Sequence, residues 1–229
     1  MRKLMTAFTV SMLMTTPLLA QEKGGEDARG YVTGLGGFAR SVGNTTGDVS
    51  LEGGVRIAPH LMVIGNLGRY GNLQGALQPT LDTESAALAA NQNLGVTTGG
   101  TVDAWYGLGG LRFEVPTRSR VMPYVLGEIG RAHLSPNPQF FFSTGTLPDG
   151  SSPVVGEDVT TALVNTGSIT VPPSSTATMM TAGGGMQVLL ARRWTADAGY
   201  RYSRIAADSA LSTSALNTNG MTFGIGYRF

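Results

Sequence analysis

The last nine residues of the chain alternate strictly between apolar side chains and small or polar ones. Five alternate positions are apolar, namely Met221, Phe223, Ile225, Tyr227 and Phe229. Successive side chains of a β-strand point to opposite faces, so this period of two predicts a strand with one apolar, aromatic face. A soluble sheet can use such a strand once, whereas a transmembrane β-barrel needs it throughout, with the apolar face toward lipid.

Seven further segments share this alternation. The pattern predicts strands at 30–40, 48–57, 61–70, 102–114, 121–131, 178–190, 195–205 and 219–229. Their lengths are close to the ~9–11 residues that a tilted membrane strand needs.

The connections between these segments alternate in length. Those at 58–60, 116–120 and 191–194 are short, whereas those at 71–101 and 132–177 are very long, with further joins at 41–47 and 206–218. Short turns on one rim and long loops on the other are typical of outer-membrane barrels. An even number of strands closes an antiparallel barrel without an exposed edge. The fold class expected is therefore all-β, a closed antiparallel eight-stranded transmembrane β-barrel with short periplasmic turns and long extracellular loops.

Charged residues within the strands test this interpretation, because an Arg or Lys on the lipid side costs ~2–4 kcal/mol at the membrane midplane. The alternation turns most mid-strand charges to one face, the interior. The expected lumen set is Glu52, Arg56, Arg112, Glu114, Glu128, Asp197, Arg201 and Arg228. Four acids balance four arginines, whose planar forks pair carboxylates at two points. We expect a fixed plug, since eight strands leave little room for water. The alternative is a gate whose pairs exchange partners.

The N-terminus reads as an export signal. Arg2 and Lys3 precede an apolar stretch that is too short to span a bilayer, and Ala20 precedes polar residues. This predicts a signal peptide over 1–20, cleaved after export through the Sec pathway, and a barrel domain over 21–229. Removing 1–20 changes the formal charge from +1 to −1. A nearly neutral chain argues against nucleic acid as a partner, and a chain without cysteine has no disulfides.

The long connections differ in character. Residues 82–93 favour a short helix, with Asp82 or Thr83 as its N-cap. The stretch 135–176 is rich in Ser, Thr, Pro and Gly, a composition typical of mobile loops. It contains Phe140-Phe141-Phe142. These rings could anchor an extracellular ligand, or they could fold onto the barrel rim or into lipid headgroups.

Together, the N-terminal segment, the eight alternating segments, the rhythm of connections and the end Gly224 to Phe229 resemble the small outer-membrane barrels of the OmpA/OmpX and opacity-protein type. The resemblance covers 21–229 and implies a bacterial outer-membrane location among lipid and lipopolysaccharide. In this family the C-terminal strand is a signal for the barrel-assembly machinery, which here implies Ile225, Tyr227 and Phe229. No peptidoglycan-binding domain is implied.

Candidates for chemistry are few. The pair His133-x-Ser135 faintly resembles the His-x-Ser of outer-membrane lipid A deacylases, but Pro136 follows directly and the nearest acids at a suitable spacing are Glu157 and Asp158. Two distant histidines, His60 and His133, do not make a metal site. The Gly-x-Gly-Gly strings at 34–37 and 107–110 do not open a helix in a βαβ unit, so no dinucleotide cofactor is expected.

The sequence therefore predicts a barrel without catalytic, cofactor or metal residues. The leading hypothesis is a structural or surface-interaction role, in which long loops contact an extracellular ligand. A low-conductance, porin-like channel is the alternative, and a lipid A-modifying enzyme is the remote one.

Overall fold

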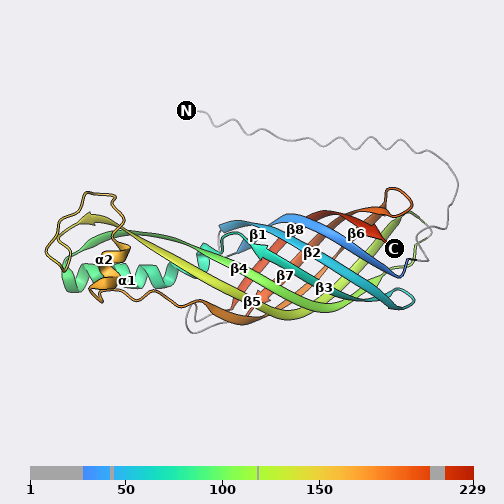
Figure 1. The fold of residues 1–229 in the computed structure, drawn as a ribbon, viewed down its shortest axis with the longest axis horizontal. Coiled ribbons are helices and arrows are strands. Elements are labelled where there is room, and N and C mark those ends of the chain that lie inside the picture. The colour runs from blue at the N-terminus through green and yellow to red at the C-terminus, as the bar shows by residue number, and fades with distance from the viewer. Residues whose placement is uncertain (1–27, 42–43, 118, 207–214) are drawn as a thin grey trace, which may run out of the picture.

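Eight antiparallel strands form a closed barrel in the computed structural model, which describes residues 28–41, 44–117, 119–206 and 215–229 (Figure 1). The signal-peptide prediction for 1–20 lies outside the described residues. The strands are β1 (Gly30–Ser41), β2 (Asn44–Ala58), β3 (Leu61–Tyr70), β4 (Gly95–Glu114), β5 (Val121–Thr144), β6 (Ser175–Leu189), β7 (Trp194–Ile205) and β8 (Leu216–Arg228). Each strand pairs with its sequence neighbours, and β8 closes the ring by pairing with β1. The predicted fold class is confirmed.

The strands are staggered around the ring. Followed through all eight strands, the pairing that starts at Tyr31 returns to β1 at Ser41, ten residues farther along. A stagger of this kind requires strands that tilt by ~35–45° from the barrel axis. The tilt is visible in Figure 1 as strands that run obliquely across the cylinder.

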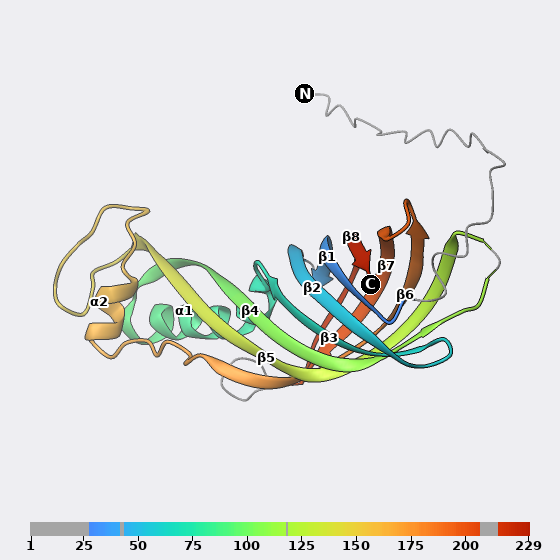
Figure 2. The same ribbon diagram turned by 45° about the vertical axis from the view of Figure 1, so that its right-hand side comes forward.

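Two strands are much longer than the alternation predicts. We expected loops at 71–101 and 132–177, but β4 already begins at Gly95 and β5 continues to Thr144. Beyond the last pairs with β3 at Ala104 and with β6 at Leu134, β4 and β5 pair with each other and with no other strand, apart from an isolated bridge between Phe141 and Asp158. We call this projecting hairpin, residues 95–103 and 135–144, the ribbon. It extends well past the rim, as Figure 2 shows.

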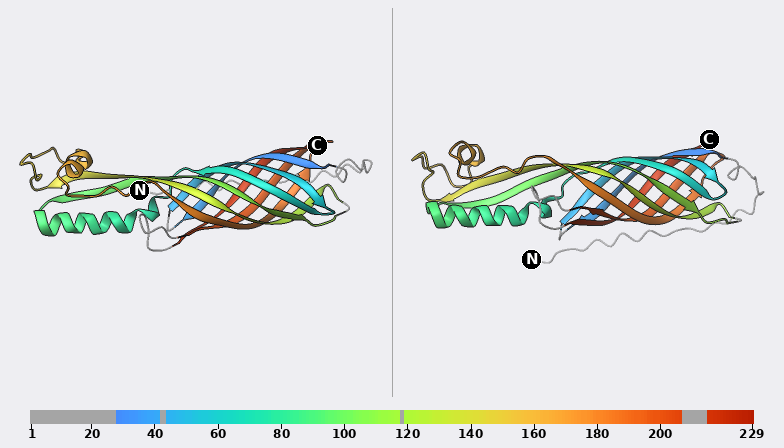
Figure 3. Two further views of the ribbon diagram at one scale, coloured as in Figure 1. Left: turned by 60° about the horizontal axis from the view of Figure 1, so that its bottom comes forward. Right: turned by 90° about the horizontal axis from the view of Figure 1, so that it is seen from below.

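Two helices accompany the ribbon. Helix α1 (Gln78–Gln92) lies along it, and α2 (Thr160–Asn165) lies near its tip (Figure 3). We call the ribbon with residues 71–94 and 145–174 the extracellular unit. The stretch 135–176, expected to be a mobile loop, thus contains the end of β5 and α2. The polar composition of this stretch suggested a mobile loop, but a few widely spaced apolar residues suffice to hold the stretch in place.

The helix predicted at 82–93 exists, but it starts earlier and lacks the predicted cap. It begins at Gln78 with Pro79 in its first turn, where a missing N–H costs nothing. Asp82 instead accepts a hydrogen bond from the Gln78 side chain at 2.8 Å, and Thr83 donates to the Pro79 carbonyl at 2.9 Å. Asn93 ends the helix in the left-handed conformation, with φ of 51°.

The free edge of β5 in the ribbon is protected from pairing with other chains. Phe140 donates its backbone N–H to Thr160 Oγ1 and Phe142 donates its own to the Glu157 carbonyl, both at 2.8 Å. Pro136 and Pro138 occupy the preceding alternate positions of the same edge and have no N–H to offer. Proline and covering loops are common protections of exposed sheet edges.

The outer surface of the barrel carries a continuous apolar belt. The apolar residues that the alternation predicts to face lipid are exposed on the outside of the barrel. They include Leu51, Leu111, Val125 and Phe223. The first strand turns Val32 and Phe38 outward, and its inward positions include Thr33, Leu35 and Ala39. Among the described residues, the helices are all too short or too polar to cross a membrane.

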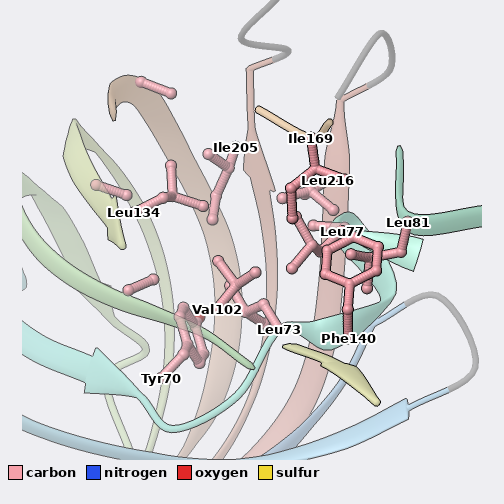
Figure 4. Close-up of a cluster of buried hydrophobic side chains, with 14 of the residues drawn as sticks. Tyr70, Leu73, Leu77, Leu81, Val102, Leu134, Phe140, Ile169, Ile205 and Leu216 are labelled. Carbon is pink, nitrogen blue, oxygen red and sulfur yellow. The ribbon is translucent and has the colours of Figure 1, made fainter. Parts of the chain in front are cut away.

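An apolar cluster joins the extracellular end of the barrel interior to the extracellular unit. Inside the barrel it contains Tyr70, Tyr106, Leu134, Met179, Ile205 and Leu216. It continues without a break through Leu73, Leu77, Leu81, Leu88, Phe140, Phe142, Leu163 and Ile169. Figure 4 shows part of it, with Ile205 and Leu216 on barrel strands and Leu77 and Phe140 in the extracellular unit.

Candidate functional site

The candidate site is the set of charged residues inside the barrel. Inward positions on β2, β4, β5, β7 and β8 contribute them, because period-two alternation turns these side chains away from lipid. Seven of the eight residues of the expected lumen set are buried, and the eighth, Arg56, is partly exposed. The structure joins all eight in one network of ion contacts.

Glu52 lies at the centre of this network. Its Oε1 accepts a hydrogen bond from the Tyr31 hydroxyl at 2.5 Å and another from Arg112 Nη1 at 3.2 Å. Its Oε2 accepts from Arg201 Nη2 at 2.5 Å. The Glu52 side chain is 1% exposed, and this one buried carboxylate pairs with two arginines that reach it from β4 and β7. Charge-assisted bonds of this kind are the strongest hydrogen bonds in proteins.

Arg112 fills the lumen between two tyrosine rings. The Cζ atom of its guanidinium lies 3.7 Å from the centroid of the Tyr124 ring and 4.8 Å from that of Tyr31. Desolvated arginine stacked on an aromatic face gains about 2 kcal/mol or more from cation–π attraction. Arg112 is 0% exposed, and it also lies 3.8 Å from Asp197 Oδ2, whose Oδ1 accepts from the Tyr124 hydroxyl at 2.7 Å.

Glu114 collects the arginines nearest the short turns. Arg228 donates a hydrogen bond to its Oε1, Arg112 lies 3.6 Å from the same oxygen, and Arg56 lies 3.7 Å from Oε2. The guanidinium of Arg228 also contacts the Met122 sulfur at 3.1 Å. Strands β2, β4 and β8 are thereby linked through a single carboxylate.

Glu128 is the least well satisfied acid of the set. Its carboxylate lies 3.6 Å from Arg201 Nη1, too far for a hydrogen bond. Among the described residues, neither of its buried oxygens has a hydrogen-bond partner. Arg201 therefore holds Glu52 tightly and Glu128 loosely.

The sequence analysis missed two features of the lumen. The first is a set of inward tyrosines that bind its acids: Tyr31 and Tyr124 in the network, and Tyr106, whose hydroxyl donates to Asp48 at 2.8 Å. The second is the apolar extracellular end of the interior. Adjacent apolar residues such as Met179-Met180 break the alternation there and could have indicated it.

The histidine and serine of the enzyme hypothesis lie on the outer face of β5. His133 is exposed, and its Nδ1 lies 3.0 Å from Thr176 Oγ1. Asp103, which pairs with Ser135 across the ribbon, is bound by Arg69 at 2.7 Å. Within the described part of the chain, no hydrogen bond joins His133 to Ser135 or to an acid, and no cluster of three or more acids or histidines could hold a metal.

The apolar side chains of the C-terminal strand point outward, to the same side. Ile225 and Phe229 are exposed and Tyr227 is partly exposed. Tyr227 stacks edge-on against Trp194 with ring centroids 5.5 Å apart, and its hydroxyl accepts from Arg193 at 3.1 Å. These rings lie at the end of the barrel that carries the short turns, where aromatic girdles of membrane barrels occur.

Solved structures of other proteins are similar to this chain. A search of curated protein sequences found no match. Among solved structures, Neisserial surface protein A is similar with a TM-score of 0.50 and 14% identity, over 87% of this chain and 96% of that one. OprG of Pseudomonas aeruginosa aligns with a TM-score of 0.45 and 12% identity over 91% and 99% of the chains. Ail of Yersinia pestis aligns with a TM-score of 0.44 and 14% identity, over 87% of this chain and 96% of that one.

The likeness to the Neisserial protein concerns the fold alone. The sequence of residues 6–229 matches the family described as outer membrane protein beta-barrel domain. That match confirms the resemblance to small outer-membrane barrels and the bacterial outer-membrane location. The chain belongs to the outer membrane protein beta-barrel domain family.

Proposed function

We propose that this protein is a closed, non-enzymatic barrel that presents its extracellular unit to molecules outside the cell. The observation that carries the proposal is the continuous apolar cluster that fastens the two longest connections to the barrel mouth. Loops that only connect strands do not need an apolar core that they share with the barrel. Long connections in compact folds are commonly binding elements.

The lumen supports a plug rather than a path. Arg112 and Glu52 are fully buried in the middle of the barrel, and the apolar cluster lies above them at the extracellular end. An ion that crosses would have to break a contact such as Arg201 to Glu52 and then pass an apolar layer. Each step is costly, because removing one partner of a buried pair leaves an uncompensated charge.

The same geometry gives catalysis little support. An activated serine needs a base within hydrogen-bond reach and a third group to orient that base. His133 is engaged by Thr176, and Asp103 is engaged by Arg69. The polar groups of the lumen are buried among one another, where a substrate would not reach them.

Removal of the extracellular unit tests the proposal. One variant joins Gly71 to Thr101 and Leu134 to Ser175 through short glycine-serine turns, so that the extracellular part of the shared apolar cluster is absent and the barrel part stays. The barrel is expected to keep its heat-dependent shift in gel mobility, while adhesion to host cells, phage adsorption or serum survival falls to the level of a null strain. Unchanged phenotypes in all three assays, with the shortened barrel at normal surface abundance, would refute the proposal.

A low-conductance channel is the second candidate, and one observation favours it. Arg201 contacts two acids and Arg112 contacts three, so either guanidinium could exchange partners and open a gap. A channel predicts ion steps in planar bilayers that change when Arg112 or Glu128 becomes alanine. Silent bilayers for the wild type and both variants would remove this candidate.

The outward apolar residues at the C-terminal end of the chain fit the role of an assembly signal. Ile225, Tyr227 and Phe229 lie on one face of the strand that closes the barrel against β1. The variant Tyr227→Ser with Phe229→Ser is expected to slow assembly by the barrel-assembly machinery in reconstituted membranes. Met221→Ser, on the same face but farther from the end, is the matched control.

A further inference from the structure

Four exposed arginines lie on the outside of the barrel near its extracellular end. Arg40, Arg69, Arg131 and Arg204 belong to β1, β3, β5 and β7, the strands that run toward the extracellular unit. Every second strand therefore carries one outward arginine. The apolar belt between them and the short turns has no charged residue at the described outward positions of the strands.

These arginines lie at one height. The stagger of ten residues is shared among eight strands. When the pairing is followed from one strand to the next-but-one strand, it therefore arrives two to three residues too close to the extracellular end, and the residue at equal height lies that many residues nearer the short turns. Arg131 pairs with Thr178 on β6. The Thr178 carbonyl accepts a hydrogen bond from the N–H of Ala206, which follows the end of β7. Arg204 lies two residues closer to the short turns than Ala206, and is therefore level with Arg131.

The same displacement relates the other arginines. The pairing from Arg69 runs through Trp105 to His133, and Arg131 lies two residues below His133. The pairing from Tyr202 runs through Asn219 to Arg40, and Arg204 lies two residues above Tyr202. All four arginines therefore ring the barrel where its apolar belt ends.

Three of the four have no acidic partner among the described residues. Arg69 is neutralised by Asp103 at 2.7 Å and its guanidinium lies 5.5 Å from the Trp105 ring centroid. No ion pair within the described chain involves Arg131, Arg204 or Arg40. We call these three the arginine arc.

Hydrogen-bonding side chains fill the arc between its arginines. Thr178 on β6 is exposed between Arg131 and Arg204, and Asn217 and Asn219 on β8 are exposed between Arg204 and Arg40. Next-but-one strands lie about 10 Å apart, so two flexible arginine side chains can converge on one group above the strand between them. An uncompensated row of donors at this height is suited to anions.

We propose that the arginine arc binds the phosphate groups of the phosphorylated glycolipid of the outer leaflet. The arc lies at the extracellular border of the belt, the height at which headgroup phosphates of that leaflet meet the barrel. Arginine binds phosphate oxygens through two parallel N–H groups, and its apolar stem extends along the belt while the guanidinium reaches the polar layer.

The test is lipid binding by the purified full chain in detergent. The protein is titrated with bisphosphorylated lipid A, and bound lipid is counted by native mass spectrometry. Dephosphorylated lipid A and phosphatidylglycerol are the comparison lipids. The test variant carries Arg40→Gln, Arg131→Gln and Arg204→Gln together, and the matched control is Arg69→Gln, which lies at the same height but already has a partner.

The triple variant is expected to lose at least about 10-fold in affinity for lipid A, whereas Arg69→Gln stays within about 2-fold of the wild type. The triple Arg→Lys variant keeps the positive charges and is expected to lose less affinity for lipid A than the triple Arg→Gln variant. If the Arg→Gln variant fails to fold, the Arg→Lys variant still tests the proposal. Equal affinity of the wild type and the Gln variant, or equal binding of dephosphorylated lipid A, would overturn the proposal. Equal binding of phosphatidylglycerol would overturn the assignment to the glycolipid.

Discussion

Glu52→Gln removes the charge at the centre of the lumen network and leaves the shape of the side chain almost unchanged. The carboxylate accepts hydrogen bonds from Tyr31, Arg112 and Arg201 and is 1% exposed. Its neutral replacement leaves two buried guanidinium groups, on β4 and β7, short of one negative charge. The barrel should therefore lose stability with little change in packing.

The size of the loss follows from these contacts. Removing one partner of a buried ion pair costs about 3–5 kcal/mol. Glu52 serves two arginines, so the upper part of that range is expected. Glu128→Gln is the matched control, because its carboxylate has one ion contact, at 3.6 Å, and no hydrogen bond within the described chain. Neutralising it also removes the cost of desolvating a charge, so a change of about 1 kcal/mol or less is expected.

The assay is reversible urea unfolding of the refolded barrel in lipid vesicles, followed by tryptophan fluorescence and by heat-dependent gel mobility. A free energy of unfolding reduced by about 3–5 kcal/mol for Glu52→Gln and by about 1 kcal/mol or less for Glu128→Gln supports the argument. Equal losses for the two variants, or a Glu52→Gln barrel as stable as the wild type, would refute it.

Three further experiments test other parts of the fold. Leu111→Arg, in the middle of the apolar belt, is expected to cost ~2–4 kcal/mol in vesicle unfolding and Thr45→Arg, at its border, ~0–1 kcal/mol; equal costs would contradict the membrane placement. A Cβ added to Gly110 would collide with the backbone of β5, whereas Gly127 has open space around it. Gly110→Ala should therefore lower refolding yield while Gly127→Ala leaves it unchanged. Phe140→Ala should cost the extracellular unit about 3–5 kcal/mol and expose it to proteinase K, while the barrel keeps its gel shift; a protease-resistant unit would count against the shared core.

The alternation of side chains predicted the barrel well because its two environments differ so sharply. Strand β8 must turn Phe223 and Ile225 to lipid, and β7 must turn Asp197 and Arg201 inward, so a slip of one residue would be prohibitive in every strand. The inward acids and arginines could be identified for the same reason. Their pairing could not, because it depends on the stagger, which sequence periodicity does not contain.

The extracellular unit was poorly predicted for a different reason. Outside the membrane, neither face of the ribbon meets lipid, so the strict alternation that identified the barrel strands fades between Gly95 and Val102 and beyond Leu134. Stability there comes from widely spaced residues such as Leu77, Phe140 and Leu163 that meet only in three dimensions. Local composition could therefore suggest a mobile loop where a shared core exists.

Planar-bilayer recording of the purified, refolded full-length barrel tests the central claim most directly. With Arg112 and Glu52 buried in the lumen and an apolar layer above them, the protein should insert and give no ion steps, and removal of the extracellular unit should not create them. Reproducible unitary conductance from the wild type, altered by Arg112→Ala, would contradict a closed barrel and favour the channel.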